Sequence, residues 1–153
     1  MQNYNINSAY ISDINKDLIL TYIVIRQKPE ILCDFLEQYQ RDYDNTLQND
    51  RNILFLSIRK HFNHQRFEIN YKQFSDNWIP RAAQLIFLNK TCFNGLYRLN
   101  SKGEFNVPSG KYPTPTISDS ENIFAVSRIL KNVEIRLANY SECFNEATQN
   151  SFV

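Results

Sequence analysis

The stretch LNKTCFNGLYRLNSKGEFNVP, at residues 88–108, is the part of the sequence that says most about the fold. All three glycines of the chain lie between positions 95 and 110, in this stretch or just after it. The runs LYRL (96–99) and EFNV (104–107) flank NSKG (100–103), which places a glycine where a turn needs a positive φ. The sequence therefore predicts a β-hairpin with its turn at NSKG.

A hairpin of this composition can read DNA. A two-stranded ribbon fits the major groove of B-DNA, and an arginine on it can donate two hydrogen bonds to O6 and N7 of guanine. Arg98 is the candidate for that contact. The residues alone leave a second interpretation open, in which Phe93 and Leu96 belong to the core and Arg98 is a solvated strand residue.

The charge distribution is uneven along the chain. Residues 51–112 carry ten Lys/Arg against three Asp/Glu, whereas the rest of the chain carries seven against thirteen. A basic block in a nearly neutral chain is typical of a surface that meets phosphate, although solvated basic faces are also common. The candidates for phosphate contacts are Arg59, Lys60, Arg81, Lys90, Lys102 and Lys111.

The composition indicates the class of protein. The 153 residues are 42% apolar and 22% charged, which is typical of one folded domain. The apolar runs are shorter than the roughly 20 residues that a membrane helix needs, and residues 2–13 do not form a signal peptide. Three cysteines lie far apart, with only two histidines to accompany them. These counts argue against a disulfide framework and a metal site, and they favour a reducing cytoplasm.

Strands and helices are predicted on both sides of the hairpin from hydrophobic spacing. A strand at residues 9–12 ends at Asp13, and a helix follows at 14–26. Asp13 is suited to accept hydrogen bonds from two ribose hydroxyls, to cap the helix, or to do both. The other expected elements are helices from Pro29 to the polar stretch 42–50, at 51–63, from Pro80, from a capping box at 118–121 to 130, and from Ser141, with strands at 133–138 and from 151, and an exposed linker at Pro113 and Pro115.

The stretch at residues 88–108 closely resembles the Dam-type (D12 class) adenine-specific DNA methyltransferases. SDIN (12–15) and IRLANY (135–140) agree with the same family in the right order, so the resemblance covers essentially the whole chain. It implies an α/β fold, namely a partial Rossmann-like S-adenosylmethionine-dependent methyltransferase fold with a helical target-recognition insert that carries the β-hairpin. It assigns residues 1–28 and 117–153 to the methyltransferase (cofactor) domain and residues 29–116 to the DNA-binding insert.

The resemblance also implies roles for single residues. Arg98 would read the guanine of a GATC-like site in double-stranded DNA, and Leu96 would make an apolar contact with a base. Phe93 and Asn94 would act where the target adenine leaves the helix, because a stacked and paired adenine cannot reach a cofactor. The full set of implied DNA contacts is Lys90, Phe93, Asn94, Leu96, Arg98, Asn100, Pro108 and Lys111.

Three further residues are implied to bind the cofactor. In the family, the acidic residue that matches Asp13 holds the ribose of S-adenosylmethionine. Asn139 and Tyr140 stand where the family usually has Asp-Phe, beside the adenine of that cofactor. The substitution retains a hydrogen-bonding side chain followed by a ring.

Two parts of the family's machinery are absent from the sequence. No glycine precedes Gly95, so the glycine-rich cofactor loop is missing, and no two prolines are adjacent, so the catalytic Asp-Pro-Pro-Tyr is missing. We therefore expect no catalytic residue in this chain. It is interpreted as the middle of a longer bacterial or phage enzyme, with the missing motifs lost or supplied by a complementing fragment. The alternative is a catalytically inactive DNA-binding remnant.

Overall fold

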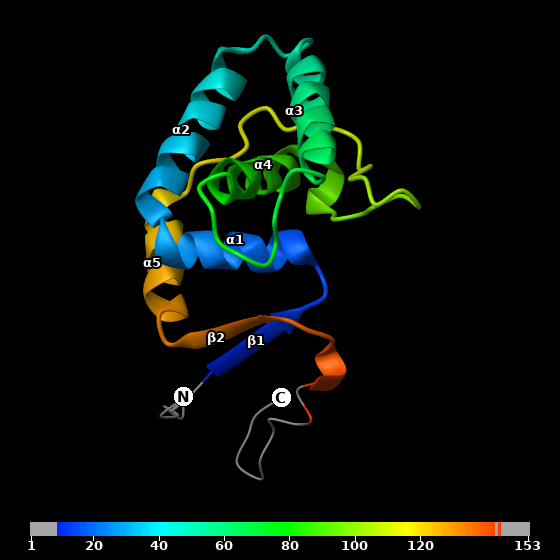
Figure 1. Ribbon diagram of the computed structural model, residues 1–153. Helices are drawn as coiled ribbons and strands as arrows, with labels where there is room; N and C mark the ends of the chain where they lie inside the picture. Colours follow the sequence, from blue (N-terminus) through cyan, green and yellow to red (C-terminus); the bar gives the residue numbers. More distant parts are fainter. Residues whose placement is uncertain (1–8, 143, 145–153) are drawn as a thin grey trace.

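Two short strands form the sheet of this protein, whose computed structural model describes residues 9–142 and 144. β1 (Ala9–Asp13) pairs in parallel with β2 (Val133–Leu137), so that Ala9 lies opposite Val133 and Asp13 lies opposite Leu137. Parallel neighbours need a crossover connection, and here the crossover contains all the helices between them. In Figure 1 these helices lie on one side of the two strands.

Five α-helices make up most of the described chain. They are α1 (Lys16–Gln27), α2 (Pro29–Asn45), α3 (Arg51–Gln65), α4 (Trp78–Thr91) and α5 (Ser120–Leu130), with 3-10 turns η1 (Phe93–Gly95) and η2 (Tyr140–Glu142). The expectation of a mixed α/β protein with parallel strands is confirmed. The helix predicted from Ser141 coincides in part with η2, whereas Cys143 and the strand expected from residue 151 lie outside the described residues.

Several helix ends differ from the sequence-based expectations. α1 begins after Asn15, whose side-chain oxygen accepts the first free amides, so Asp13 is not its N-cap. α5 is capped by Asp119, which accepts from the amide of Asn122 at 3.2 Å, rather than by the expected capping box. α4 starts two residues before Pro80 because proline is tolerated throughout the first turn of a helix.

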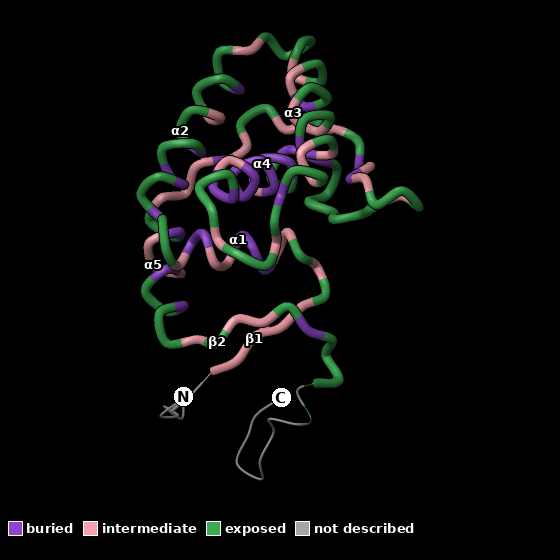
Figure 2. The backbone as a smooth tube through the Cα atoms, viewed as in Figure 1, coloured by how far each residue is buried: buried purple, intermediate pink, exposed green. Residues whose placement is uncertain are grey.

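The core is built around α4, which packs against α1, α2 and α3. Ten of its fourteen residues are buried, as the purple tube in Figure 2 shows. A helix that is apolar nearly all round is stable only when other helices cover it on several sides. The polar segment that leads to α5 is tied to this core by Gln40 of α2, whose side-chain oxygen accepts the Ile117 amide at 2.7 Å.

The predicted hairpin forms as an irregular loop. Its turn is as expected, since Gly103 has φ +73° and the amide of Gly103 donates to the carbonyl of Asn100 at 2.9 Å. The flanking runs do not become regular strands and pair only at isolated bridges, including one between Leu99 and Phe105. Beside this bridge the amide of Asn106 donates to the carbonyl of Arg98 at 3.1 Å, while the backbone groups of Phe105 face away from Leu99 and bond the side chain of Asn63 of α3 at 2.8 and 3.0 Å.

Among residues 9–142 and 144, no helix is both long and apolar enough to cross a membrane. Cys33 and Cys92 are buried free thiols. Within the same residues, no group of three or more possible ligands is arranged to hold a metal ion.

Candidate functional site

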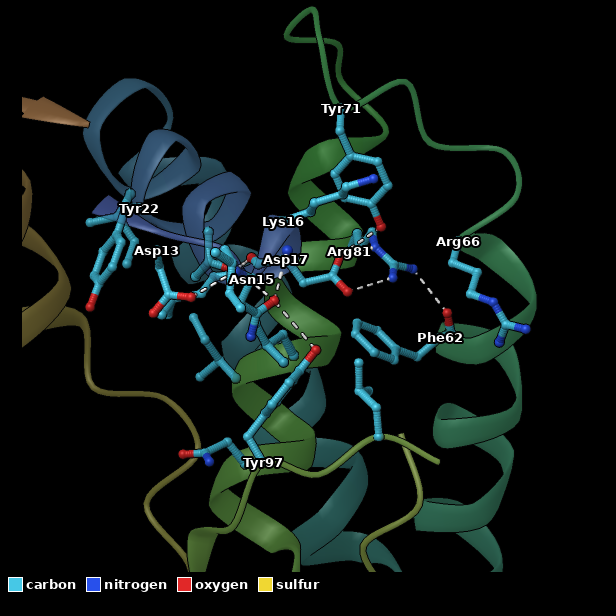
Figure 3. Close-up of a pocket in the computed structure, with 18 of the residues that line it drawn as sticks. Asp13, Asn15, Lys16, Asp17, Tyr22, Phe62, Arg66, Tyr71, Arg81 and Tyr97 are labelled. Carbon is cyan, nitrogen blue, oxygen red and sulfur yellow. Dashed lines mark hydrogen bonds and ion pairs between the residues drawn. The ribbon is translucent and has the colours of Figure 1, made fainter. Parts of the chain in front are cut away.

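A cleft of about 1150 Å³ opens between the start of α1 and the root of the irregular loop. Asp13 and Asn15 line it from the β1 side, Lys90 from the end of α4, and Tyr97 from the loop. Figure 3 shows the side chains of Asp13, Asn15 and Tyr97 meeting at the cleft from separate parts of the chain. The structure therefore places Asp13, which is predicted to bind the cofactor, and Lys90, which is predicted to contact DNA, in the walls of one cleft.

Asp13 stands at the carboxyl end of β1, where ligands bind in open α/β sheets. Its side-chain Oδ1 accepts the amide of Asn15 at 2.7 Å, which orients the carboxylate. The backbone amide of Ala138 donates to the carbonyl of Asp13 at 3.1 Å, so the residues that follow β2 reach the same edge. Asn139 and Tyr140 are both exposed there, but they do not line the cleft.

The turn at Phe93–Gly95 presents two side chains to solvent. Asn94 has φ +54°, in the left-handed region, and Gly95 follows with φ +60°. Asparagine and glycine are the residues that tolerate this conformation best. The turn is held by the amide of Asn94, which donates to the hydroxyl of Tyr112 at 3.1 Å, and by the amide of Phe93, which donates to the carbonyl of Pro108 at 2.9 Å. Phe93 is 51% exposed, so the turn supports an aromatic ring without burying it.

Arg98 belongs to the loop at residues 96–107, which extends away from the helices in Figure 1. It is exposed, and its Nε donates to the side-chain oxygen of Asn106 at 2.8 Å. A second, longer contact of 3.4 Å joins Nη2 to the backbone carbonyl of Asn106. A guanidinium held through Nε keeps its outer edge available for the two-bond contact that arginine makes with guanine. Leu96 is exposed on the same loop.

The other predicted DNA contacts have different surroundings. Lys90, Pro108 and Lys111 are exposed. Asn100 is engaged within the turn, where its side-chain oxygen accepts the amides of Lys102 at 2.9 Å and Glu104 at 3.0 Å. Its amide group donates to the carboxylate of Glu104, and this hydrogen bond is the main cause that lowers the pKa of Glu104. The side chain of Asn100 therefore stabilises the turn.

Arg81 was expected among the phosphate contacts, and this is wrong. It is 1% exposed, and its guanidinium forms a two-bond ion pair with Asp17, from Nε to Oδ1 at 2.6 Å and from Nη2 to Oδ2 at 2.9 Å. Its Nη1 donates to the carbonyl of Phe62 at 2.9 Å. Arg59 is also partly withdrawn from solvent, because it donates to the carbonyl of Val107 at 3.0 Å.

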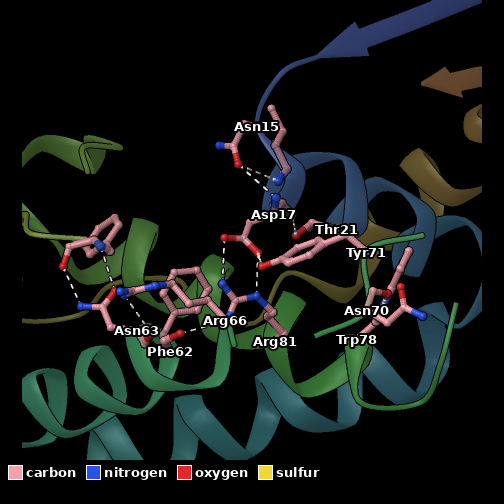
Figure 4. Close-up of polar contacts among 12 residues, drawn as sticks. Asn15, Asp17, Thr21, Phe62, Asn63, Arg66, Asn70, Tyr71, Trp78 and Arg81 are labelled. Carbon is pink, nitrogen blue, oxygen red and sulfur yellow. Dashed lines mark hydrogen bonds and ion pairs between the residues drawn. The ribbon is translucent and has the colours of Figure 1, made fainter. Parts of the chain in front are cut away.

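The Arg81–Asp17 pair is the centre of a buried junction that sequence reasoning missed (Figure 4). The hydroxyl of Tyr71 donates to Asp17 Oδ1 at 2.8 Å. Burial, followed by the negative charge of Asp17, raises the pKa of Tyr71 well above its usual value, so the hydroxyl keeps its proton. The signal in the sequence was a lone arginine inside the apolar run of α4, since a buried charge needs a partner.

Comparison with known proteins shows the family of the chain. A family model for D12 class N6 adenine-specific DNA methyltransferases matches residues 1–153. The type II methyltransferase M.MjaIII of Methanocaldococcus jannaschii is 37% identical over the whole chain and over 50% of its own length. A DNA adenine methylase of Vibrio cholerae is 32% identical over 94% of the chain and 46% of its own length. A DNA N-6-adenine-methyltransferase of Escherichia phage P1 is 39% identical over 69% of the chain and 12% of its own length.

The chain belongs to the D12 class N6 adenine-specific DNA methyltransferase family. The resemblance seen in the sequence is thereby confirmed. The chain spans about half the length of the first two of these relatives.

Proposed function

We propose that this member of the D12 class is the DNA-recognition part, and one edge of the cofactor site, of a DNA adenine methyltransferase. The reaction would transfer a methyl group from S-adenosylmethionine to the exocyclic amino group of adenine, in GATC sites of double-stranded DNA. The observation that carries the proposal is the shared cleft, because it connects the carboxyl end of β1, at Asp13, with the root of the exposed loop. We place the reaction in the cytoplasm, where bacterial and phage DNA is found.

The loop would read the site directly. Arg98 would donate two hydrogen bonds to guanine through the guanidinium edge left open by Asn106, and exposed Leu96 and Pro108 would contact bases. Phe93 would fill the space left by the extruded adenine, and Asn94 would offer its amide to the unpaired bases or to phosphate. The basic exposed side chains Lys90 and Lys111 would contact phosphate, which fixes the position on the duplex without reading sequence.

The cofactor edge would be formed at the carboxyl ends of β1 and β2. The residues present fit the ribose of S-adenosylmethionine, since the half-buried carboxylate of Asp13 lines the cleft and can accept hydrogen bonds from hydroxyl groups. Asn139 and Tyr140 would lie beside its adenine. When bound, the cofactor would supply the methyl group. This arrangement corresponds to a Rossmann-like domain made of residues 1–28 and 117–153, interrupted by an insert at 29–116.

Methyl transfer would need a second segment. Adenine's amino lone pair is delocalised into its ring, and acceptors such as those of Asp-Pro-Pro-Tyr are required to activate it. Neither that tetrapeptide nor a glycine-rich loop occurs in these 153 residues. The complementing segment would provide both. We expect the chain alone to transfer no labelled methyl group from S-adenosylmethionine to a GATC duplex, and incorporation would show that residues of this chain form a complete site.

The recognition role is tested by the Arg98→Ala variant and fluorescence anisotropy. Losing a two-bond contact with a base costs about 1–3 kcal/mol, or roughly five- to 150-fold in affinity, for the GATC duplex, and little for a permuted duplex. The matched control is Arg41→Ala on α2, since Arg41 is 59% exposed and pairs with Glu37 at 3.8 Å outside the basic block. An equal loss on both duplexes would refute direct reading by Arg98.

A further inference from the structure

Tyr97 lies between two residues that the proposed function assigns to DNA, yet its side chain lies on the opposite side of the loop. The cleft is lined by Tyr97 and Leu99 but not by Leu96 or Arg98, which places Tyr97 on the cleft side of the loop. Its ring packs edge-on against Phe105, with the ring centroids 5.9 Å apart. It also lines the cleft, where Figure 3 shows it directed towards the start of α1.

The hydroxyl of Tyr97 meets a residue that governs the first turn of α1. It lies 3.4 Å from the side-chain oxygen of Asn15, to which it donates. The same oxygen accepts the amides of Asp17 at 3.0 Å and Leu18 at 3.3 Å, so Asn15 caps the helix. The backbone amide of Asn15 in turn donates to the carboxylate of Asp13 at 2.7 Å. Two hydrogen bonds, from Tyr97 to Asn15 and from Asn15 to Asp13, therefore connect the loop to the acidic residue at the cofactor edge.

The far side of this first turn is fixed. Asp17, two residues beyond Asn15, is held by both ends of the Arg81 guanidinium and by Tyr71. By contrast, the contact from Tyr97 to Asn15 is longer than the usual 2.7–2.8 Å of a hydroxyl hydrogen bond. Burial raises the pKa of Tyr97 to about 12, so its hydroxyl keeps the proton that it donates at neutral pH. In this first turn of α1, Asp17 is therefore held firmly, whereas the contact between Tyr97 and Asn15 can still shorten.

We infer that Tyr97 is a positioning residue that couples DNA recognition to the cofactor edge. When Leu96 and Arg98 engage DNA, the loop is drawn into one position, the hydroxyl of Tyr97 shortens its contact with Asn15, and Asn15 holds the carboxylate of Asp13. The inference rests on the proposed function, because it requires DNA to bind the loop. Coupling of this kind is reciprocal, so a ligand held by Asp13 would also favour the DNA-bound position of the loop.

The test measures amide hydrogen exchange at residues 15–18 by NMR, with and without a GATC or a permuted duplex. The GATC duplex is expected to slow exchange of the Asp17 and Leu18 amides about fivefold, the change that one hydrogen bond of about 1 kcal/mol produces. Tyr97→Phe retains the ring on Phe105 and removes only the hydroxyl. It should abolish this slowing and, because the coupling is reciprocal, weaken binding to the GATC duplex by no more than about fivefold.

Two further variants separate the hydroxyl contact from general effects. Asn15→Ser retains a good helix cap but shortens the side chain, so it should lose the slowing as Tyr97→Phe does. Tyr22→Phe removes a hydroxyl from the same cleft without touching Asn15, and it should behave like the wild type.

The outcomes distinguish this inference from the proposed function. GATC-specific protection that persists in Tyr97→Phe, or specific DNA binding that does not slow exchange at residues 15–18 in the wild type, would overturn the coupling and leave DNA recognition intact. If the wild-type chain showed no preference for the GATC duplex, the proposed function would fail first, and the coupling with it.

Discussion

Replacing Arg81 with leucine is expected to destabilise the protein more than any surface substitution. Arg81 is 1% exposed, and three of its nitrogens donate to Asp17 and to the carbonyl of Phe62 at 2.6 to 2.9 Å. The variant leaves the carboxylate of Asp17, whose side chain is only 13% exposed, without its cation. Removing one partner of a buried ion pair typically costs about 3–5 kcal/mol, a large share of the roughly 5–15 kcal/mol that stabilises a domain.

Urea unfolding followed by the fluorescence of Trp78 measures this change. Trp78 is the single tryptophan of the chain, and it is 3% exposed beside Phe74 at the start of α4. The midpoint should fall while the dependence of the free energy of unfolding on urea stays the same. The exposed residue Arg128 provides the control, because Arg128→Leu should change the free energy of unfolding by less than about 0.5 kcal/mol.

A double variant tests the physical reason. Replacing both partners, in Arg81→Leu with Asp17→Leu, removes the uncompensated charge, so the double variant should be more stable than Arg81→Leu alone. Tyr71 then loses its acceptor, which limits the recovery. A loss below about 1 kcal/mol for Arg81→Leu, or a double variant less stable than the single one, would refute the assignment of Arg81 as a paired buried charge.

Three other outcomes follow from the same contacts. Asn94→Val should be less stable than Asn94→Gly by about 1–2 kcal/mol in thermal unfolding, because φ is +54° there, and equal midpoints would contradict this conformation. Gln40→Leu should cost about 1–3 kcal/mol by leaving the Ile117 amide without its acceptor, whereas Gln40→Glu, which retains an acceptor, should cost less. Burial raises the pKa of Tyr97 to about 12, so its hydroxyl ionises at lower pH in the unfolded chain than in the folded one. The free energy of unfolding should therefore keep its full value below pH 10 and fall between pH 10 and 12, and in Tyr97→Phe it should fall less steeply.

Hydrophobic spacing and helix-start signals predicted the strands and helices whose formation depends on neighbouring residues in the sequence. The strand ending at Asp13, the helix opened by Pro29 and the strand from Val133 all follow from hydrophobic spacing and helix-start signals. The turn at Gly103 was also predictable, because glycine is needed where φ is positive. The exposure of Phe93 could not be read from the residues alone, since an aromatic ring next to a turn is equally suited to a core.

The remaining features depend on contacts between distant segments. Asn63 of α3 holds the predicted hairpin against the helices by bonding the backbone of Phe105, which is 42 positions away. Tyr97 meets Asn15 across 82 positions, and Arg81 meets Asp17 across 64. Spacing within one element carries no information about such meetings, which is why the buried junction and the link to Asp13 emerge only in three dimensions.

The central claim is that this chain recognises a specific DNA site, and the most direct test compares two dissociation constants. The wild-type chain would be titrated at one salt concentration against a GATC duplex and against a duplex with the same bases permuted. We predict tighter binding to the GATC duplex by at least about tenfold, since each wrong base pair costs about 1–3 kcal/mol, with an affinity for both that falls as salt rises. Equal dissociation constants for the two duplexes would contradict the claim.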